Sequence, residues 1–224
     1  MNTLREFFYS RTTGPGVWKW DHYFEIYDRH FRRFVDRPVS LLEIGVYSGG
    51  SLEMWRAYLG PLARVYGVDI HPDCKAYEKP GVEIFIGDQG DPGFWREFKA
   101  AVPPLDVVID DGSHKARNQI MTLEALLPHI NPGGVYLCED IHGYPDNRFA
   151  EYVGILARAL NDHRGLETNP EDDARRLVRR PTELQAEIDG IHLYPYVAVV
   201  EKRAAPLAEF VAPKRGTEWQ PFKP

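Results

Sequence analysis

Several features that would assign this sequence to a whole class of protein are scarce or missing. Cysteine occurs twice in 224 residues, as Cys74 and Cys138, which is too few for the disulfide framework of a small secreted domain. No apolar run reaches the roughly 18 residues of a membrane-spanning helix, and the N-terminal MNTLREFFYS has no signal-peptide core. Positive charge is in deficit, since 27 Lys and Arg stand against 33 Asp and Glu, a net charge of −6. We therefore expect a soluble, cytoplasmic protein with neither a membrane partner nor a nucleic-acid partner.

The composition that is present is ordinary for a globular protein. Hydrophobic residues make up 43% of the chain and charged residues 27%, so a core can form without a disulfide or a metal. The length corresponds to one domain with extensions, at about 150 residues per domain. We expect an N-terminal arm with a capping helix at 1–35, one main domain at 36–203 and a proline-rich tail at 204–224.

Short apolar runs alternate with helical patterns through the main domain. Such alternation predicts βαβ units and a parallel sheet with helices on both faces. The unbroken apolar runs LLEIGV and DVVID are typical of strands that are buried on both sides. The expected strands are 39–46, 63–70, 81–88, 105–111 and 135–140, and the expected helices are 51–60, 91–102 and 115–130.

The C-terminal part of the main domain predicts a different connection. After a further helix, residues 164–183 are charged and weakly periodic, which indicates an insertion, and its basic run 175–180 is interpreted as an exposed helix face. Two strands, 186–194 and 196–203, leave only Pro195 between them, so they must be antiparallel. The predicted fold is therefore α/β: a doubly wound, Rossmann-like sheet of seven strands, mostly parallel, with an antiparallel C-terminal hairpin.

An aromatic-rich segment precedes the sheet. Residues 1–17 are polar and punctuated by glycine, which indicates an arm. Apolar and aromatic residues recur at helical spacing between 18 and 34, so we expect an amphipathic helix there. Two interpretations stay open: this helix caps the core, or it roofs a ligand site with Trp18, Trp20, Tyr23 and Tyr27.

Acidic residues stand at the carboxyl end of every expected parallel strand, which is where open α/β sheets bind their ligands. Stacked carboxylates would repel a pyrophosphate, and Tyr47 breaks the G-x-G-x-x-G pattern of dinucleotide binding after the first strand. A cationic ligand with hydroxyls fits better, and S-adenosylmethionine (SAM) carries a sulfonium, an ammonium and a ribose. Asp69 stands 24 residues beyond Gly45, the place of an acid that binds a ribose.

Three of the acids exceed what such a cofactor needs. Asp111, Glu139 and Asp140 stand at the tips of two strands that we expect to be neighbours. Clustered carboxylates cannot all stay ionised without a cation, and oxygen ligands select hard divalent ions such as Mg²⁺. His114 follows Asp111 by three residues, so it would lie at the rim of the same site and could accept a proton from a hydroxyl.

Six stretches carry a family resemblance: LLEIGVYSGGSLEMW, YGVDIHP, IFIGDQGDPGFW, DVVIDDGSH, LLPHINPGGVYLCED and IHLYPYVAVVEK. They resemble class I SAM-dependent methyltransferases and, within that class, the metal-dependent sugar O-methyltransferases of macrolide biosynthesis. The segment WKWDHYFEIYDRHF is similar to the one that leads into the catalytic domain of those enzymes. The resemblance covers about residues 16–202 and identifies 36–203 as the methyltransferase domain. We expect no counterpart of the additional N-terminal domain of those enzymes.

The resemblance implies a role for each strand-end residue. Asp111, Glu139 and Asp140 match the magnesium ligands, and His114 matches the proposed general base. The cofactor-binding residues would be Glu43, Gly45 and Ser51 around the methionine part of SAM, Asp69 at the ribose, Asp88 and Gln89 facing the adenine, and Asp110 beneath the cofactor.

We therefore expect a Mg²⁺-dependent O-methyltransferase that acts on a hydroxyl of a sugar or glycosylated natural product. Its metal would chelate a vicinal diol and lower the pKa of the hydroxyl, and His114 would take the proton. Two alternatives stay open: an O-methyltransferase of phenolic or catechol small molecules, and a non-catalytic SAM-binding partner of another enzyme. The expected partners are the small-molecule acceptor and a second copy of the chain, since we also expect a homo-oligomer.

Overall fold

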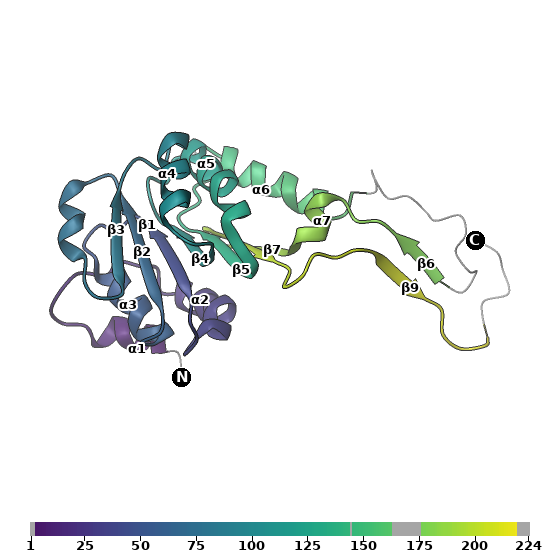
Figure 1. Cartoon of the computed structure of the whole chain (residues 1–224), viewed down its shortest axis with the longest axis horizontal. Helices are drawn as coiled ribbons and strands as arrows, with labels where there is room; N and C mark the ends of the chain where they lie inside the picture. The colour runs from purple at the N-terminus through teal and green to yellow at the C-terminus, as the bar shows by residue number, and fades with distance from the viewer. Residues whose placement is uncertain (1–2, 144, 163–175, 219–224) are drawn as a thin grey trace.

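A computed structural model describes residues 3–143, 145–162 and 176–218 of the chain (Figure 1). Its main feature is a seven-stranded sheet with the strand order β3-β2-β1-β4-β5-β8-β7. The first five of these strands are parallel, while β8 lies antiparallel to both β5 and β7. The predicted fold is confirmed, including the antiparallel hairpin. The strands are β1 (Ser40–Ile44), β2 (Arg64–Asp69), β3 (Val82–Ile86), β4 (Leu105–Asp110), β5 (Ile130–Cys138), β7 (Ile188–Tyr194) and β8 (Val197–Lys202).

Helices cover both faces of this sheet (Figure 1). Leu41 and Leu42 are neighbours in β1 and both are fully buried, yet they belong to two different hydrophobic clusters. This is the pattern of a parallel sheet that is buried on both sides. One cluster packs on α1 (Thr3–Ser10), α2 (Tyr23–Phe31) and α3 (Gly50–Leu59), and the other on α4 (Pro92–Ala101), α5 (Ala116–Leu126) and α6 (Arg148–Ala159).

Short elements complete the connections, and at α4 the local sequence explains where the helix begins. Asp91 accepts a hydrogen bond from the N–H of Gly93 at 2.7 Å, with Pro92 at the first helical position, so α4 has a favoured start. The short elements are η1 (Arg32–Phe34), η2 (Pro72–Tyr77), η3 (Leu127–His129) and α7 (Glu183–Glu187). Within the described residues, no helix is both long and apolar enough to cross a membrane.

The N-terminal residues form more than the expected arm. Leu4, Phe7 and Phe8 have helical spacing, and the helix α1 buries Leu4 completely. The rings of Phe8 and Phe24 lie 5.0 Å apart, so α1 packs on α2 as well as on the body. The prediction of an arm over 1–17 is therefore wrong for residues 3–10, which form α1. The apolar pattern there is short, and the glycines that follow it favoured an irregular segment.

A second, two-stranded sheet extends away from the body (Figure 1). It pairs β6 (Arg176–Arg179) with β9 (Phe210–Pro213) in antiparallel fashion. The interpretation of 175–180 as a helix face is thus wrong for the described part, since β-pairing with the tail determines the local structure. The tail, expected to have no core pattern, contributes the exposed strand β9. Residues 164–175 of the predicted insertion lie outside the described residues.

Candidate active site

A cavity of about 1120 Å³ opens at the carboxyl ends of the parallel strands. Parallel register brings these ends together, with Ile44 of β1 beside Asp110 of β4, which is in turn beside Cys138 of β5. All of the predicted site residues line this cavity except Glu43 and Asp110, which are buried below its surface. The position agrees with the rule that ligands bind at this edge of an open α/β sheet.

The glycine-rich turn after β1 is held in place by Asp69. The Oδ2 atom of Asp69 accepts hydrogen bonds from the backbone N–H groups of Val46 (2.9 Å) and Tyr47 (3.0 Å), and Oδ1 accepts one from His71 (2.9 Å). Gly45 has a φ of +93°, and a Cβ there would collide with the carbonyl oxygen of Asp111. A glycine is therefore required where the turn meets the next loop, and Asp69 keeps lone pairs for a further donor.

Gln89 and Asp110 form a buried polar network at one side of the cavity. Asp110 accepts hydrogen bonds from Gln89 Nε2 and the Tyr136 hydroxyl, both at 3.0 Å. Burial raises the pKa of Asp110 to about 6, against the lowering effect of these hydrogen bonds. Gln89 also accepts from the N–H of Ser113 at 2.5 Å, so its amide positions the 111–114 loop. Asp88 stays at the cavity, where it accepts a hydrogen bond from the N–H of Gly90 at 2.8 Å.

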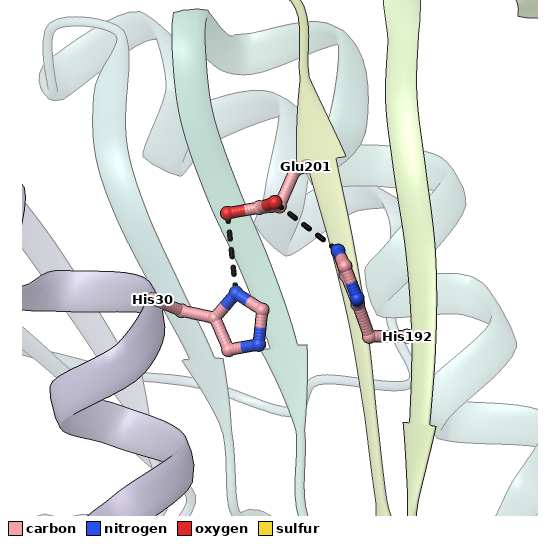
Figure 2. A group of neighbouring side chains, drawn as sticks. All are labelled: His30, His192 and Glu201. Atoms are coloured by element: carbon pink, nitrogen blue, oxygen red, sulfur yellow. Dashed lines mark hydrogen bonds and ion pairs between the residues drawn. The ribbon is translucent and has the colours of Figure 1, made fainter.

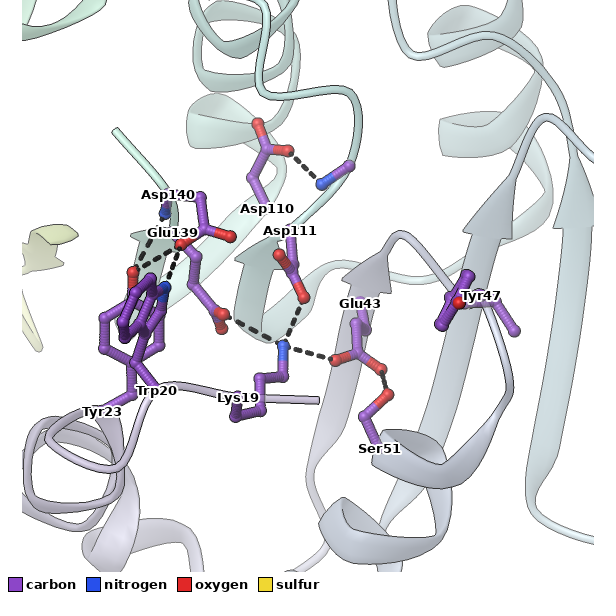
Figure 3. A network of polar contacts seen from close by, with 12 residues as sticks. Lys19, Trp20, Tyr23, Glu43, Tyr47, Ser51, Asp110, Asp111, Glu139 and Asp140 are labelled. Carbon is purple, nitrogen blue, oxygen red and sulfur yellow. Dashed lines mark hydrogen bonds and ion pairs between the residues drawn. The ribbon is translucent and has the colours of Figure 1, made fainter. Parts of the chain in front are cut away.

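A buried lysine lies among the acids of β1, β4 and β5 (Figure 3). The Nζ atom of Lys19 is 2.5 Å from Asp111 Oδ2, 3.0 Å from Glu139 Oε2 and 3.4 Å from Glu43 Oε1. Only 3% of the Lys19 side chain is exposed. Burial lowers the pKa of this ammonium, but the three carboxylates more than reverse that effect and raise it well above its usual value.

The two glutamates of this cluster depend on that ammonium. Glu43 also accepts a hydrogen bond from the Ser51 hydroxyl at 2.5 Å, and Glu139 accepts one from the Tyr27 hydroxyl at 2.6 Å. Burial raises the pKa of both glutamates, while Lys19 opposes that rise. The structure thus gives Glu43 and Ser51 a joint role in holding the cluster, and it holds Glu139 deeper than the other predicted metal ligands.

The remaining acids face the cavity beside His114. One donor atom each from Asp111, His114 and Asp140 lies within 4.8 Å of the others, and His114 Nε2 is 3.8 Å from Asp140 Oδ2. Asp140 Oδ1 is occupied by Trp20 Nε1 (3.0 Å) and the Tyr23 hydroxyl (2.7 Å). His114 and Asp140 both have a positive φ, +54° and +49°, a strained conformation that is common at functional sites. This group has the donor types and spacing to accept a divalent cation.

Sequence reasoning missed Lys19 and only partly resolved the aromatic residues beside it. Tyr23 and Tyr27 are fully buried and use their hydroxyls on the acids, which supports packing as their main role. Trp18 is 85% exposed and Trp20 55% exposed, and both line the cavity. A polar residue between two tryptophans, W-K-W, was the only signal for Lys19, and it is weak without the fold.

Comparison with known proteins gives a consistent result. The profile of a family described as a methyltransferase domain matches residues 42–141. The chain is 35% identical to 8-demethyl-8-alpha-L-rhamnosyl tetracenomycin-C 2'-O-methyltransferase of Streptomyces olivaceus, over 85% of this chain and 53% of that protein. It is 33% identical to mycinamicin VI 2''-O-methyltransferase of Micromonospora griseorubida, over 79% of this chain and 47% of that protein.

Solved structures agree with these sequence matches. The MycE methyltransferase from the mycinamycin biosynthetic pathway, in complex with Mg, SAH and mycinamycin VI, superposes with a TM-score of 0.73 at 30% identity. The match covers 90% of this chain and 53% of that one. The chain therefore spans about half the length of the relatives it matches.

Replacing Lys19 with methionine should destabilise the fold strongly at neutral pH. The substitution keeps the length of the side chain but leaves Glu43, Asp111 and Glu139 without their cation, and breaking a buried pair in this way costs about 3–5 kcal/mol. A carboxyl whose pKa is raised in the folded state makes the fold less stable as the pH rises from the unfolded-state pKa, about 4, to the folded-state pKa. The deficit should therefore shrink toward pH 4, as measured by urea unfolding across pH.

The matched control is Lys79→Met, which removes a partly exposed ion pair with Glu53. Such pairs contribute about 1 kcal/mol or less, and the loss should change little between pH 5 and 8. Equal stability of the two variants at pH 7 would contradict the assigned role of Lys19.

Proposed function

We infer that the chain is a SAM-dependent methyltransferase of the Rossmann-like fold, since a methyltransferase-domain profile matches residues 42–141 and the sheet has that topology. From this premise we propose that it methylates a hydroxyl on the sugar of a glycosylated small molecule. The observation that carries the proposal is the group of Asp111, His114 and Asp140 at the carboxyl edge of the sheet. The named relatives are O-methyltransferases of rhamnosyl tetracenomycin and mycinamicin substrates, which supports a sugar acceptor for this chain.

The cofactor would lie against the β1 turn. Gly45, Ser51 and Asp69 line the cavity there, and Asp88 lies further along the same edge. The glycine at 45 lets the backbone approach the ligand, and the acids suit a cation. When bound, SAM supplies a methyl group on a sulfonium that is already a good leaving group. The protein contributes alignment and charge placement, which supply most of the rate in such transfers.

A magnesium ion would be held by Asp111 and Asp140, with Glu139 as the deeper third carboxylate. Oxygen donors of this kind are those that Mg²⁺ prefers. When bound, the ion lowers the pKa of a hydroxyl that contacts it. Lys19 and Tyr27 occupy both oxygens of Glu139, so this ligand would have to share its lone pairs or shift.

His114 would receive the proton of the acceptor hydroxyl. Its side chain is 35% exposed at the cavity, and Asp140 stands beside it to stabilise the imidazolium that forms. The acceptor would approach across Trp18 and Trp20, because both side chains line the cavity and are exposed. Trp20 is also held by stacking on Tyr196 at 5.8 Å. Aromatic walls of this kind are common in small-molecule sites.

Activity of the purified chain should require both the metal and His114. We expect transfer of a labelled methyl group from SAM to glycosides with vicinal hydroxyls, and loss of that transfer with EDTA and recovery with Mg²⁺. His114→Ala should lower kcat by about 10²–10⁴-fold, the usual contribution of a general base. His129→Ala should leave kcat unchanged, because His129 ends η3 directly before the amino end of β5, at the opposite edge of the sheet from the cavity.

The acceptor panel separates the open alternatives. Catechols also offer two neighbouring oxygens to a metal, so higher turnover on catechols than on glycosides would favour the phenolic alternative. Transfer that survives both EDTA and His114→Ala would contradict the proposed chemistry, and tight SAM binding without any turnover would favour a non-catalytic partner.

We also propose that the chain is a homo-oligomer whose interface includes the two-stranded sheet of β6 and β9. An isolated two-stranded sheet is marginal in water, yet Phe210 and Val211 of β9 are 36% and 48% exposed on it. A second copy of the chain would cover these side chains.

Light scattering coupled to size-exclusion chromatography tests the oligomer. The full chain should have a measured mass that is a multiple of 25.7 kDa. Phe210→Lys with Val211→Lys should lower this mass toward that of the monomer, because both lysine charges would be buried in the interface. Glu209→Lys, at the edge of the same strand, should have a smaller effect. A monomeric full chain would refute the assignment.

A further inference from the structure

A second group of side chains of the types that ligate metals lies outside the cavity, between α2 and the C-terminal hairpin (Figure 2). His30 comes from α2, His192 from β7 and Glu201 from β8. These three elements are brought together only by the folded chain, because His30 is more than 160 residues from Glu201 in sequence. Two imidazoles and a carboxylate form a donor set typical of zinc sites.

The spacing of the donor atoms is close to that of a coordination shell. Glu201 Oε1 is 3.1 Å from His30 Nδ1, and Glu201 Oε2 is 3.2 Å from His192 Nε2. All three donors lie within 4.8 Å of one another. In a tetrahedral zinc site with bonds of about 2.0–2.1 Å, the ligand atoms are separated by about 3.4 Å. The two separations from Glu201 run to different oxygens of its carboxylate and are a few tenths of an ångström below this value, so an ion held through both carboxylate oxygens would need the least movement of these side chains.

The surroundings also fit a metal ligand at His30. The ring nitrogen of His30 that does not face Glu201, Nε2, is 2.9 Å from the Tyr194 hydroxyl. Metal-bound histidines almost always have such a partner on the second nitrogen, which fixes the ring and its tautomer. His30 is buried, whereas 41% of the His192 side chain is exposed, so the group is open to solvent on one side and an ion has a path to it.

One cation already contacts the group. Arg33 Nη1 is 2.8 Å from Glu201 Oε1, and its Nη2 donates to the carbonyl of Gly133 at 3.2 Å. The Arg33 side chain is 43% exposed, so it can move into solvent when Glu201 binds an ion. Without an ion, the same residues form a hydrogen-bonded network in which Glu201 accepts from Arg33 and both histidines.

We propose that His30, His192 and Glu201 bind one transition-metal ion of the zinc type, separate from the magnesium site of the cavity. Imidazole donors favour Zn²⁺ and Co²⁺, whereas Mg²⁺ prefers oxygen, so the two sites differ in selectivity. The ion would tie α2 to the β7–β8 hairpin. Because α2 also carries Tyr23 and Tyr27, which donate hydrogen bonds to Asp140 and Glu139, the bound ion would also stabilise the positions of these two acids at the cavity.

Zinc binding in excess Mg²⁺ tests the site directly. Equilibrium dialysis of the metal-free chain against Zn²⁺, with Mg²⁺ present to fill the cavity, should give one bound zinc per chain and a rise in Tm. Co²⁺ in place of Zn²⁺ should give the visible absorption of a low-coordinate Co²⁺ site. His192→Ala should weaken zinc binding by more than about 100-fold, which exceeds the effect of losing an outer partner.

Two control variants locate the ion. Asp140→Asn removes a ligand of the cavity and should leave the zinc and its Co²⁺ spectrum unchanged, and His129→Ala removes an unrelated histidine with the same result. His192→Asn serves as a second, polar replacement, and circular dichroism confirms that each variant is folded. Absence of zinc uptake by the wild-type chain, or uptake that persists in both folded His192 variants, would overturn the proposal and leave the hydrogen-bonded network as the role of the group.

Discussion

Burial of carboxylates around a single ammonium is the constraint on which the rest of the site depends. Glu43 and Glu139 are fully buried at the ends of β1 and β5, and a buried unpaired charge is among the most costly features a fold can contain. Lys19 compensates them from a segment that precedes the whole sheet. The N-terminal segment is therefore a part of the candidate active site, held there by charge as well as by the aromatic packing of α2.

That ammonium divides the acids into two groups with different tasks. The inner group, Glu43 and Glu139, is occupied by Lys19 and by the hydroxyls of Ser51 and Tyr27. The outer group is Asp111 and Asp140, whose carboxylates lie beside His114 at the cavity. In the proposed function, the divalent cation would bind at the outer group, where solvent and an acceptor can also reach. The division would let many acids stand at one edge of the sheet while only the outer ones contact a ligand.

Most of the fold and most of the acids at the cavity could be predicted from sequence, for reasons that are local. Alternating apolar runs predict the parallel sheet, and strand ends are easy to locate, so Asp69, Asp111 and Asp140 were placed at the correct edge. Lys19 could not be found in this way, because its partners lie 92 and 120 residues away and a lysine between tryptophans suggests solvent exposure. The strands β6 and β9 were missed for a related reason, since each is stabilised by pairing with a distant segment and has little pattern of its own.

The most direct test of this account is electron paramagnetic resonance of bound Mn²⁺, a substitute for Mg²⁺ that reports occupancy without turnover. His192→Ala serves as the parent, so that only the cavity is counted. The account predicts one bound Mn²⁺ per chain in the parent and binding at least about tenfold weaker when Asp140→Asn is added, since a direct oxygen ligand is lost. Mn²⁺ binding that is unchanged by Asp140→Asn would contradict the claim that the outer acids form the metal site.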